Sequence, residues 1–239
     1  VLGSLWTTAT RYVSNTATLN FGGGLYAGGE LHMTGTQFIG NVAAQNHGGG
    51  VYANSAVYGS NVLFQANRGS WGGGPRANGS VALTATQFLT NTATAFGGAA
   101  CVNGAVDIVD AKFVGNRAAI GGGLYFSAAS AGQVANALFA RNSANSSGAA
   151  ISLNGNGANG PITLVHTTVA SPTVGTGPAL YVGGGIVLIT DTIVASYTTG
   201  IEQAGGSVVS DYNLFYSAPS AVEIGSHSIA DADPRFVDP

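Results

Sequence analysis

Two short motifs return along the chain at a spacing of 24 to 26 residues. The first is Phe-x-x-Asn, and its copies begin at Phe38, Phe64, Phe88, Phe113 and Phe139, with a related copy at Tyr12. The second is a glycine cluster followed by a short apolar stretch, and its copies begin at Gly22, Gly48, Gly72, Gly97 and Gly121. A fixed period of this length predicts a repeat architecture in which one structural unit stacks on the next.

The spacing of apolar residues predicts short strands rather than helices. Alternating pairs such as Val81 with Leu83 are typical of strands, whereas no stretch follows a helical period. Glycine clusters and asparagines mark the turns. Three short strands are expected in each period, and they leave no room for a crossover helix, so only a coiling chain fits the pattern. The chain is therefore expected to be all-β, a single-stranded parallel β-helix (solenoid) of about eight to nine coils without significant helix.

Each motif has a physical role in such a coil. A phenylalanine at the same place in every coil predicts an internal stack of aromatic rings along the axis. An asparagine at the same corner predicts a ladder, because its amide can hydrogen-bond to the next coil and tolerates a tight turn. The glycines supply positive φ at another corner, where a Cβ atom would clash.

The residues after each glycine cluster alternate in character. The first and third positions are apolar, as in Leu25 and Ala27, and are expected to face the interior. The position between them is expected to face outward, and it holds Tyr26, Tyr52, Arg76, Cys101, Tyr125, Ser152 and Tyr181. An outward aromatic column suits stacking on sugar rings or packing against a partner. The candidate ligand-binding residues are therefore Tyr26, Tyr52, Arg76, Tyr125 and Tyr181. The alternative is that tyrosine simply suits a strand face.

The repeat is regular over residues 1–147 and looser over residues 148–239. In the later part the phenylalanine position becomes Val169, Ile193 and Leu214, and the asparagine position becomes Ser171 and Ser196. Because the pattern runs nearly from end to end, one β-helix domain, residues 1–239, is expected rather than two globular domains.

Composition narrows the classes of function. Charged residues make up only 7% of the 239 residues, and the net charge is −3 with a single lysine, Lys112. A nucleic-acid partner needs clustered lysine and arginine and is not expected. Cys101 is the only cysteine, so no internal disulfide forms. The sequence contains no run of 18 apolar residues, so no membrane span is expected. The four histidines show no ligand spacing, and neither a metal nor another cofactor is expected.

The paired motifs over residues 4–147 resemble the right-handed parallel β-helix repeats of bacterial polymorphic outer-membrane proteins and related adhesins. The ending, residues 211–216 followed by 230–239, is similar to the closing coil of secreted β-helix proteins of the choice-of-anchor type, in which an Asp-Pro-x-Phe-Val-Asp-Pro string is common. The resemblance implies a right-handed coil and an extracellular or cell-surface location in bacteria. Because the chain starts within a repeat, we expect it to be a processed or excised piece.

Pectate-lyase-like enzymes share this fold class, so a polysaccharide lyase or hydrolase is an alternative to a structural role. Such chemistry needs carboxylates that converge, as a pair or around Ca²⁺. Three acidic pairs are candidates: Asp107 with Asp110, Asp191 with Asp211, which are expected to stack in adjacent coils, and Asp231 with Asp233. Turn residues that hydrogen-bond their own backbone explain them better, so no catalytic residue is assigned.

The repeat therefore favours a non-catalytic β-helix that serves as a rigid stalk, an adhesin segment or a fibre subunit. Both ends are expected to be open coils, whose unpaired edges favour self-association end to end or stacking within a larger surface protein. A glycan-binding module that uses the tyrosine column stays open as an alternative, as does the polysaccharide enzyme.

Overall fold

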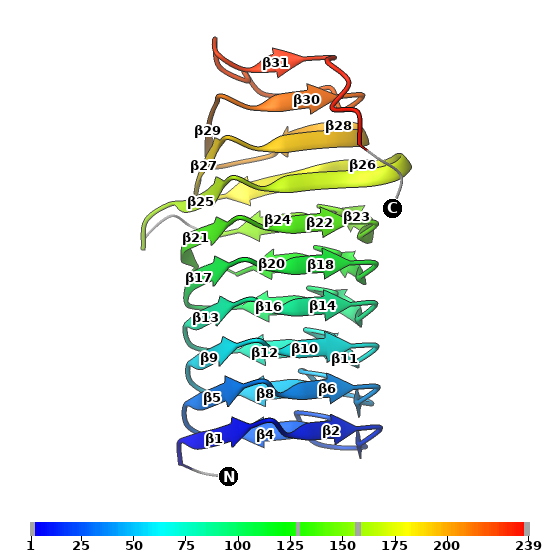
Figure 1. The fold of residues 1–239 in the computed structure, drawn as a ribbon, viewed down its shortest axis with the longest axis vertical. Coiled ribbons are helices and arrows are strands. Elements are labelled where there is room, and N and C mark those ends of the chain that lie inside the picture. Colours follow the sequence, from blue (N-terminus) through cyan, green and yellow to red (C-terminus); the bar gives the residue numbers. More distant parts are fainter. Residues whose placement is uncertain (1–2, 128–129, 156–158, 237–239) are drawn as a thin grey trace.

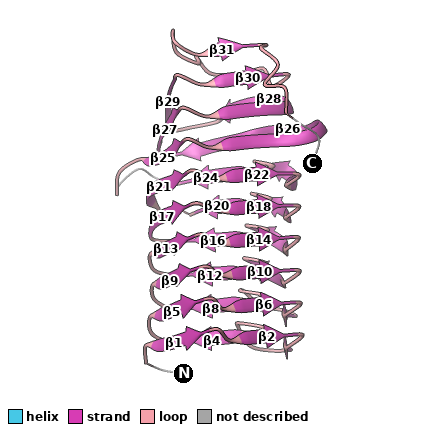
Figure 2. Cartoon of the chain, viewed as in Figure 1, coloured by secondary structure: helices cyan, strands magenta, loops and turns pink. Residues whose placement is uncertain are grey.

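A computed structural model describes residues 3–127, 130–155 and 159–236, which form a parallel β-solenoid (Figure 1). One of its sheets, sheet A, contains nine stacked strands, so about eight turns separate the first strand from the last. No helix occurs in the described ranges, and Figure 2 shows strands joined only by loops and turns. The predicted all-β parallel solenoid is therefore confirmed.

Each of the first six coils contains four strands, one more than predicted, and the strands form three sheets. Sheet A contains β1 (Leu5–Thr8), β5 (Leu31–Thr34), β9 (Val57–Ser60), β13 (Val81–Thr84), β17 (Ala105–Val109), β21 (Ala131–Ala135), β25 (Ile162–Val165), β27 (Ile186–Thr190) and β29 (Ser207–Asp211). The first arm of sheet B begins with β2 (Arg11–Val13), β6 (Gln37–Ile39), β10 (Leu63–Gln65), β14 (Gln87–Leu89), β18 (Lys112–Val114) and β22 (Leu138–Ala140). Its second arm contains β4 (Leu25–Ala27), β8 (Val51–Ala53), β12 (Pro75–Ala77), β16 (Ala100–Val102), β20 (Leu124–Phe126) and β24 (Ile151–Asn154). Sheet C contains β3 (Thr16–Ala17), β7 (Val42–Ala43), β11 (Arg68–Trp71), β15 (Thr92–Phe96), β19 (Arg117–Ile120) and β23 (Ser143–Ser147). We number the coils by their sheet A strand, so that coil one starts at β1 and coil six at β21.

The aromatic residues of the first motif form a continuous stack inside the solenoid. Phe64 pairs in register with Phe38 and Phe88, and the same pairing continues in both directions. The ring centroids from Tyr12 to Phe139 are 4.3–5.3 Å apart, and neighbouring rings are nearly parallel. The five phenylalanines of the stack are fully buried. The predicted internal stack is confirmed.

The asparagines of the first motif form a second ladder at a buried corner. The side-chain oxygen of Asn91 accepts hydrogen bonds from the backbone N–H and the side-chain amide of Asn67, both at 3.0 Å. The Asn91 amide in turn donates to the carbonyl oxygen of Phe64 at 2.8 Å and to the side-chain oxygen of Asn116 at 3.0 Å. The same pattern links Asn15 to Asn142. Each asparagine side chain therefore hydrogen-bonds to the coils on either side of its own.

The later coils have fewer strands than the first six, and two of these strands are longer. β26 (Thr168–Gly184) and β28 (Ile193–Gln203) each run without interruption from the first arm of sheet B to the second, and join the two arms. Val169 and Val194 continue the phenylalanine column and are fully buried, and Phe215 follows them. The expected Ile193 and Leu214 are each one position out of line. The separate sheet C corner, with its asparagine ladder, therefore belongs to the first six coils.

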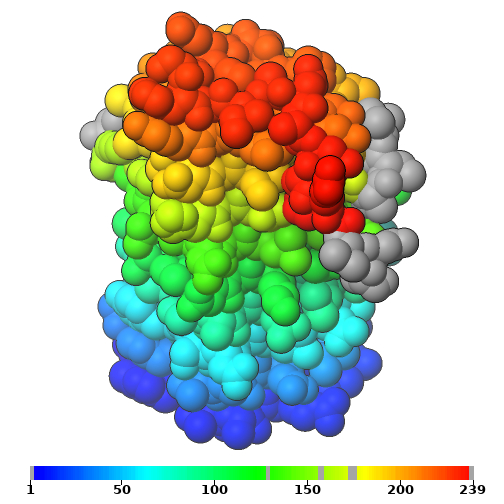
Figure 3. Space-filling model, turned by 45° about the horizontal axis from the view of Figure 1, so that its top comes forward, coloured from blue at the N-terminus to red at the C-terminus, as the bar shows by residue number. Residues whose placement is uncertain are grey.

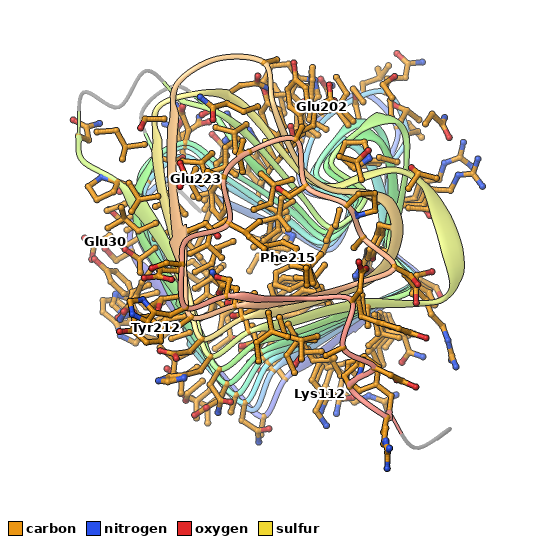
Figure 4. All side chains as sticks on the ribbon, turned by 90° about the horizontal axis from the view of Figure 1, so that it is seen from above. Glu30, Lys112, Glu202, Tyr212, Phe215 and Glu223 are labelled. Carbon is orange, nitrogen blue, oxygen red and sulfur yellow. The ribbon has the colours of Figure 1, made fainter. Side chains whose placement is uncertain are left out.

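The C-terminal end differs from an open coil. After β30 (Leu214–Tyr216), Val222 and Ile224 pack against the core, and β31 (Ile229–Ala230) pairs with β30. Orange and red residues cover this end in Figure 3, while Figure 4 shows Phe215 inside the ring of strands. An irregular last turn thus covers part of this end, but within the described chain β29 and β31 still have a neighbouring strand on one side only, so the expectation of an open end is met in part.

The N-terminal end matches the expectation of an open coil. Among the described residues, β1, β2, β3 and β4 have neighbouring strands on one side only. Leu5, Tyr12 and Leu25 pack against the core but are only partly buried, and Trp6 is 67% exposed. This edge therefore presents both apolar side chains and unpaired backbone groups.

Substitution of a glycine at the closest approach between coils is expected to be strongly destabilising. A Cβ atom on Gly98 would lie 2.2 Å from the carbonyl oxygen of Gly122 and 2.6 Å from the backbone of Arg117. Because those atoms belong to the backbone of coil five, coils four and five would have to separate. We expect Gly98→Ala to lower the free energy of unfolding by about 3 kcal/mol, measured by urea denaturation.

Gly35→Ala provides the matched control for this clash. Gly35 has a φ of 58°, but its nearest Cβ contacts would be 3.9 Å away, and the same corner in other coils holds Ala9 and Ala85 at φ values of 49° and 51°. Its cost should therefore be about 1 kcal/mol. Equal losses in the two variants would contradict the argument from close packing.

Candidate functional site

The candidate ligand-binding residues lie in one column on the second arm of sheet B. Tyr26, Tyr52, Arg76, Cys101, Tyr125, Ser152 and Tyr181 pair successively in register, and Glu202 follows Tyr181. Tyr26 is 38% exposed, whereas Tyr52, Arg76, Cys101 and Ser152 are buried. The expectation of an outward, accessible stripe is therefore wrong for its central part. Tyr125 and Tyr181 are half-buried, and ligand binding by the column stays a prediction.

A second column of mostly aromatic residues covers the first. It contains the residues directly before the five glycine clusters, namely Phe21, His47, Trp71, Phe96 and Ile120. The ring of Phe21 lies 4.4 Å from that of Tyr52, and the ring of Phe96 lies 4.6 Å from that of Tyr125. The column is therefore buried under a second aromatic layer outside the core. The recurrence of a large ring immediately before the first glycine was the signal that sequence reasoning missed.

Arg76 lies at the centre of this two-layered cluster. Its guanidinium carbon is 5.6 Å from the centroid of the Trp71 ring, and its Nη1 donates to the carbonyl oxygen of Ala77. Burial and the neighbouring Arg76 charge lower the pKa of His47. Burial raises the pKa of the Cys101 thiol to about 11, although Arg76 acts in the opposite direction. The thiol is therefore protonated and unreactive at neutral pH.

A smaller aromatic ladder lies exposed on sheet A. His32 pairs in register with Trp6 on one side and Tyr58 on the other, and the ring centroids are 4.9 Å and 4.8 Å apart. The ladder ends at Ala82 in coil four. The rings stack on one another, so most of their faces are covered and their edges meet solvent. Sequence reasoning missed this ladder because Trp6, His32 and Tyr58 are different residue types at one position.

A shallow depression lies over sheet C at coil three. It has a volume of about 350 Å³, and Gln45, Arg68, Ser70 and Thr94 contribute polar groups to its lining. The segment between the asparagine and the glycine cluster has four residues in coil three (68–71), against six in coil two (42–47) and five in coil four (92–96). The shorter segment leaves the hollow between its longer neighbours.

Three of the acidic residues considered for catalysis have hydrogen-bond partners in the next coil or in their own turn. Asp107 accepts a hydrogen bond from the side-chain amide of Gln133 at 2.9 Å, and Asp110 accepts one from Asn136. The side chain of Asp233 accepts from the backbone N–H of Arg235 at 2.8 Å, as expected for a turn residue. Each of these carboxylates is therefore bonded to an amide in the next coil or in its own turn.

Asp191 and Asp211 are not stacked, contrary to expectation. Asp211 pairs in register with Thr190, so Asp191 is one position out of line. Asp211 instead lies 2.8 Å from Nδ1 of His227, whose ring stacks on Tyr212 at 4.6 Å. The hydrogen bond from His227 lowers the pKa of Asp211. The group lies in the irregular last turn and fixes that turn to β29.

No group of three or more histidine, cysteine, aspartate or glutamate residues that could hold a metal ion occurs in the described part of the chain. Within the same residues, no helix is long and apolar enough to span a membrane. The structure thus presents a buried arginine–aromatic cluster, an exposed aromatic ladder and a polar depression. Comparison with models of protein families, with curated proteins and with solved structures finds no significant match.

Proposed function

We propose that the chain is a rigid, non-catalytic β-solenoid segment of an extracellular or cell-surface bacterial protein. The observation that carries the proposal is the continuity of the phenylalanine stack and the asparagine ladder through the first six coils. Bending between coils would require breaking both, so the segment suits a stalk that holds other parts at a set distance. The location rests on the resemblance of the repeats to bacterial surface proteins.

The surroundings of the charged residues support a non-catalytic role. Within the described ranges, the ion pairs are His32 with Glu30 and His227 with Asp211, and neither involves an arginine or a lysine. A lyase needs a cationic base or a cation beside converging carboxylates, and a hydrolase needs a pair of carboxyl groups across the bond. Among the candidate carboxylates, Asp107, Asp110 and Asp233 are bonded to amide groups and Asp211 to His227.

Stiffness can be measured directly by electron–electron distance spectroscopy between two spin labels. Thr8 and Thr190 belong to one column of sheet A, seven coils apart, and accept the labels as Thr8→Cys and Thr190→Cys in a Cys101→Ala background. At about 4.8 Å per coil, the backbones at the two labelled positions are about 34 Å apart. We expect a single narrow distribution of spin–spin distances around this value, shifted by the length of the label side chains. A broad distribution would contradict the stalk.

The enzyme alternative has a separate test. The chain is incubated with acidic and neutral polysaccharides, with and without Ca²⁺, and the release of unsaturated or reducing ends is measured. We expect no turnover. Turnover that is lost in Asp211→Ala or Asp191→Ala, but not in the exposed control Glu223→Ala, would overturn the non-catalytic assignment.

We further propose that the open edge of coil one pairs with another coil, from a second copy or from the same polypeptide. The partly buried side chains of Leu5, Tyr12 and Leu25 and the exposed Trp6 favour such a contact. Sedimentation velocity should show concentration-dependent association that Trp6→Lys abolishes and Gln133→Lys, exposed in the middle of the same column, does not. A chain that stays monomeric would contradict self-association.

A further inference from the structure

Arg76 is a buried cation without a counter-ion in the described chain. The residue is only 6% exposed, and its Nε–H has no hydrogen-bond acceptor. Its contacts are the face of Trp71 and the carbonyl oxygen of Ala77. No carboxylate in the described ranges lies within ion-pair distance of it.

This arrangement is physically incomplete. A guanidinium keeps its charge under all conditions that a protein tolerates, and its removal from water is unfavourable unless an anion or a full set of acceptors replaces the solvent. An aromatic face and one carbonyl oxygen provide part of that replacement. The unbonded Nε–H is a donor for which the described part of the chain supplies no partner.

The neighbouring titratable groups do not provide the missing negative charge. Cys101 and Tyr52 flank Arg76 in the column. Burial raises the pKa of the Cys101 thiol to about 11, and burial also raises the pKa of Tyr125. Burial and Arg76 lower the pKa of His47, so this side chain is neutral. The groups with a shifted pKa around Arg76 are therefore uncharged at neutral pH.

A second unsatisfied polar atom belongs to the same cluster. Nδ1 of His47 is buried and has no hydrogen-bond partner, and the His47 ring lies 4.9 Å from the ring of Trp71. Two of the three buried side-chain atoms without a partner among the described residues thus belong to residues that pack against the same tryptophan. Arg76 meets one face of it, and His47 packs beside it.

We propose that Arg76 binds a small anion beside Trp71, either a halide ion or the carboxylate group of an acidic ligand. The anion accepts the free Nε–H of Arg76 and neutralises its charge. A guanidinium suits this role because its donors are fixed in a plane and its hydration is weak. Trp71 is only half-buried, whereas Nε of Arg76 is enclosed, so the proposal requires the anion to enter beside the Trp71 ring. This inference is independent of the proposed stalk function.

Fluorescence can test the site because the chain has only two tryptophans. Trp6→Phe leaves Trp71 as the single reporter, and iodide is added at constant ionic strength with gluconate as the replaced anion. We expect quenching that saturates, because iodide occupies a site beside Trp71. The converse variant Trp71→Phe, which keeps only the exposed Trp6, should show quenching that rises linearly with iodide.

Arg76→Met in the Trp6→Phe background should abolish the saturable component. Arg117→Met, which removes an exposed arginine bonded only to Asn145, is the matched control and should retain it. Linear quenching with Arg76 present would overturn the proposal, as would a saturable component that survives Arg76→Met or is lost in Arg117→Met.

Competition identifies the class of anion without any change at Arg76. In the Trp6→Phe variant, stronger displacement of iodide by chloride assigns the site to a halide, and stronger displacement by acetate assigns it to a carboxylate. Saturable quenching that neither anion displaces would contradict the proposal. The competition experiment needs only the conservative Trp6→Phe change, so it tests the proposal even if Arg76→Met does not fold.

Thermal unfolding provides an independent measurement. When the preferred anion replaces gluconate at constant ionic strength, the Tm of the wild-type chain should rise by about 5 °C, since a ligand that binds only the native state stabilises it. The Tm of Arg76→Met should not change, and in gluconate it should equal or exceed that of the wild type. An equal rise in both proteins, or none in the wild type, would overturn the proposal.

Discussion

Replacement of Asn91 by alanine is expected to lower the free energy of unfolding by about 4 kcal/mol, and the Tm by about 10 °C. Asn91 is fully buried, and its amide joins coils three, four and five. Alanine leaves the backbone N–H and side-chain amide of Asn67 without their acceptor and the carbonyl oxygen of Phe64 without its donor. Each buried polar group that loses its partner costs about 1–3 kcal/mol.

Two further variants distinguish the ladder from a general effect of substitution. Asn91→Asp keeps the accepting oxygen but places a second oxygen against the carbonyl of Phe64, so we expect it to be less stable at neutral pH than at acid pH, where the carboxyl group is protonated. Asn145→Ala removes an exposed asparagine that accepts only from Arg117, and its effect should be below about 0.5 kcal/mol. Similar losses in Asn91→Ala and Asn145→Ala would refute the ladder as a source of stability.

Truncation of Phe88 to alanine is expected to cost about 3–5 kcal/mol. The side chain is fully buried, with ring centroids 5.3 Å from Phe64 and 4.6 Å from Phe113. Alanine leaves a cavity between two rings that cannot approach each other, because backbone pairing fixes the spacing of the coils. Urea denaturation monitored by circular dichroism measures the loss.

Phe88→Leu is the matched control for the cavity. Leucine fills most of the space and keeps the apolar contact, so its cost should stay below about 1.5 kcal/mol. A loss as large as that of alanine would indicate that the ring geometry, rather than the filled volume, stabilises this position.

The architecture was predictable because a few of its columns contain nearly one residue type. Where phenylalanine stacks on phenylalanine and asparagine bonds to asparagine, the same residue recurs in the sequence. Because the coils pair in register, the spacing of these recurrences stays close to constant. The fourth strand of each coil was missed because sheet C strands are short and vary in length. Their apolar alternation is too brief to be recognised.

The environment of Arg76 was not predictable from alternation alone. Alternation distinguishes residues that face the core from those that do not, and it places Arg76 correctly outside the core cluster. It does not reveal that Trp71, five residues earlier, packs back over the outer face of the same sheet. That contact depends on the turn through the glycine cluster, whose path only the three-dimensional structure gives.

The register of Asp191 was wrong for a related reason. The later coils lack the asparagine corner, so no landmark fixes the alignment of one coil on the next. Asp211 aligns with Thr190, and its partner His227 comes from a last turn that does not follow the repeat. Sequence periodicity therefore loses its value where the ladder ends.

The early coils, up to Phe113, differ in length only between the asparagine and the glycine cluster, and this constrains how the number of coils can change during evolution. From the first glycine of a cluster to the next phenylalanine the distance is 16 residues in four successive copies, starting at Gly22, Gly48, Gly72 and Gly97. Loss of residues 68–91 would join Asn67 to Thr92 and set Phe64 against Phe113, with every column still matched. Unequal recombination between copies can therefore add or remove whole coils and adjust the reach of the rod in steps of about 4.8 Å.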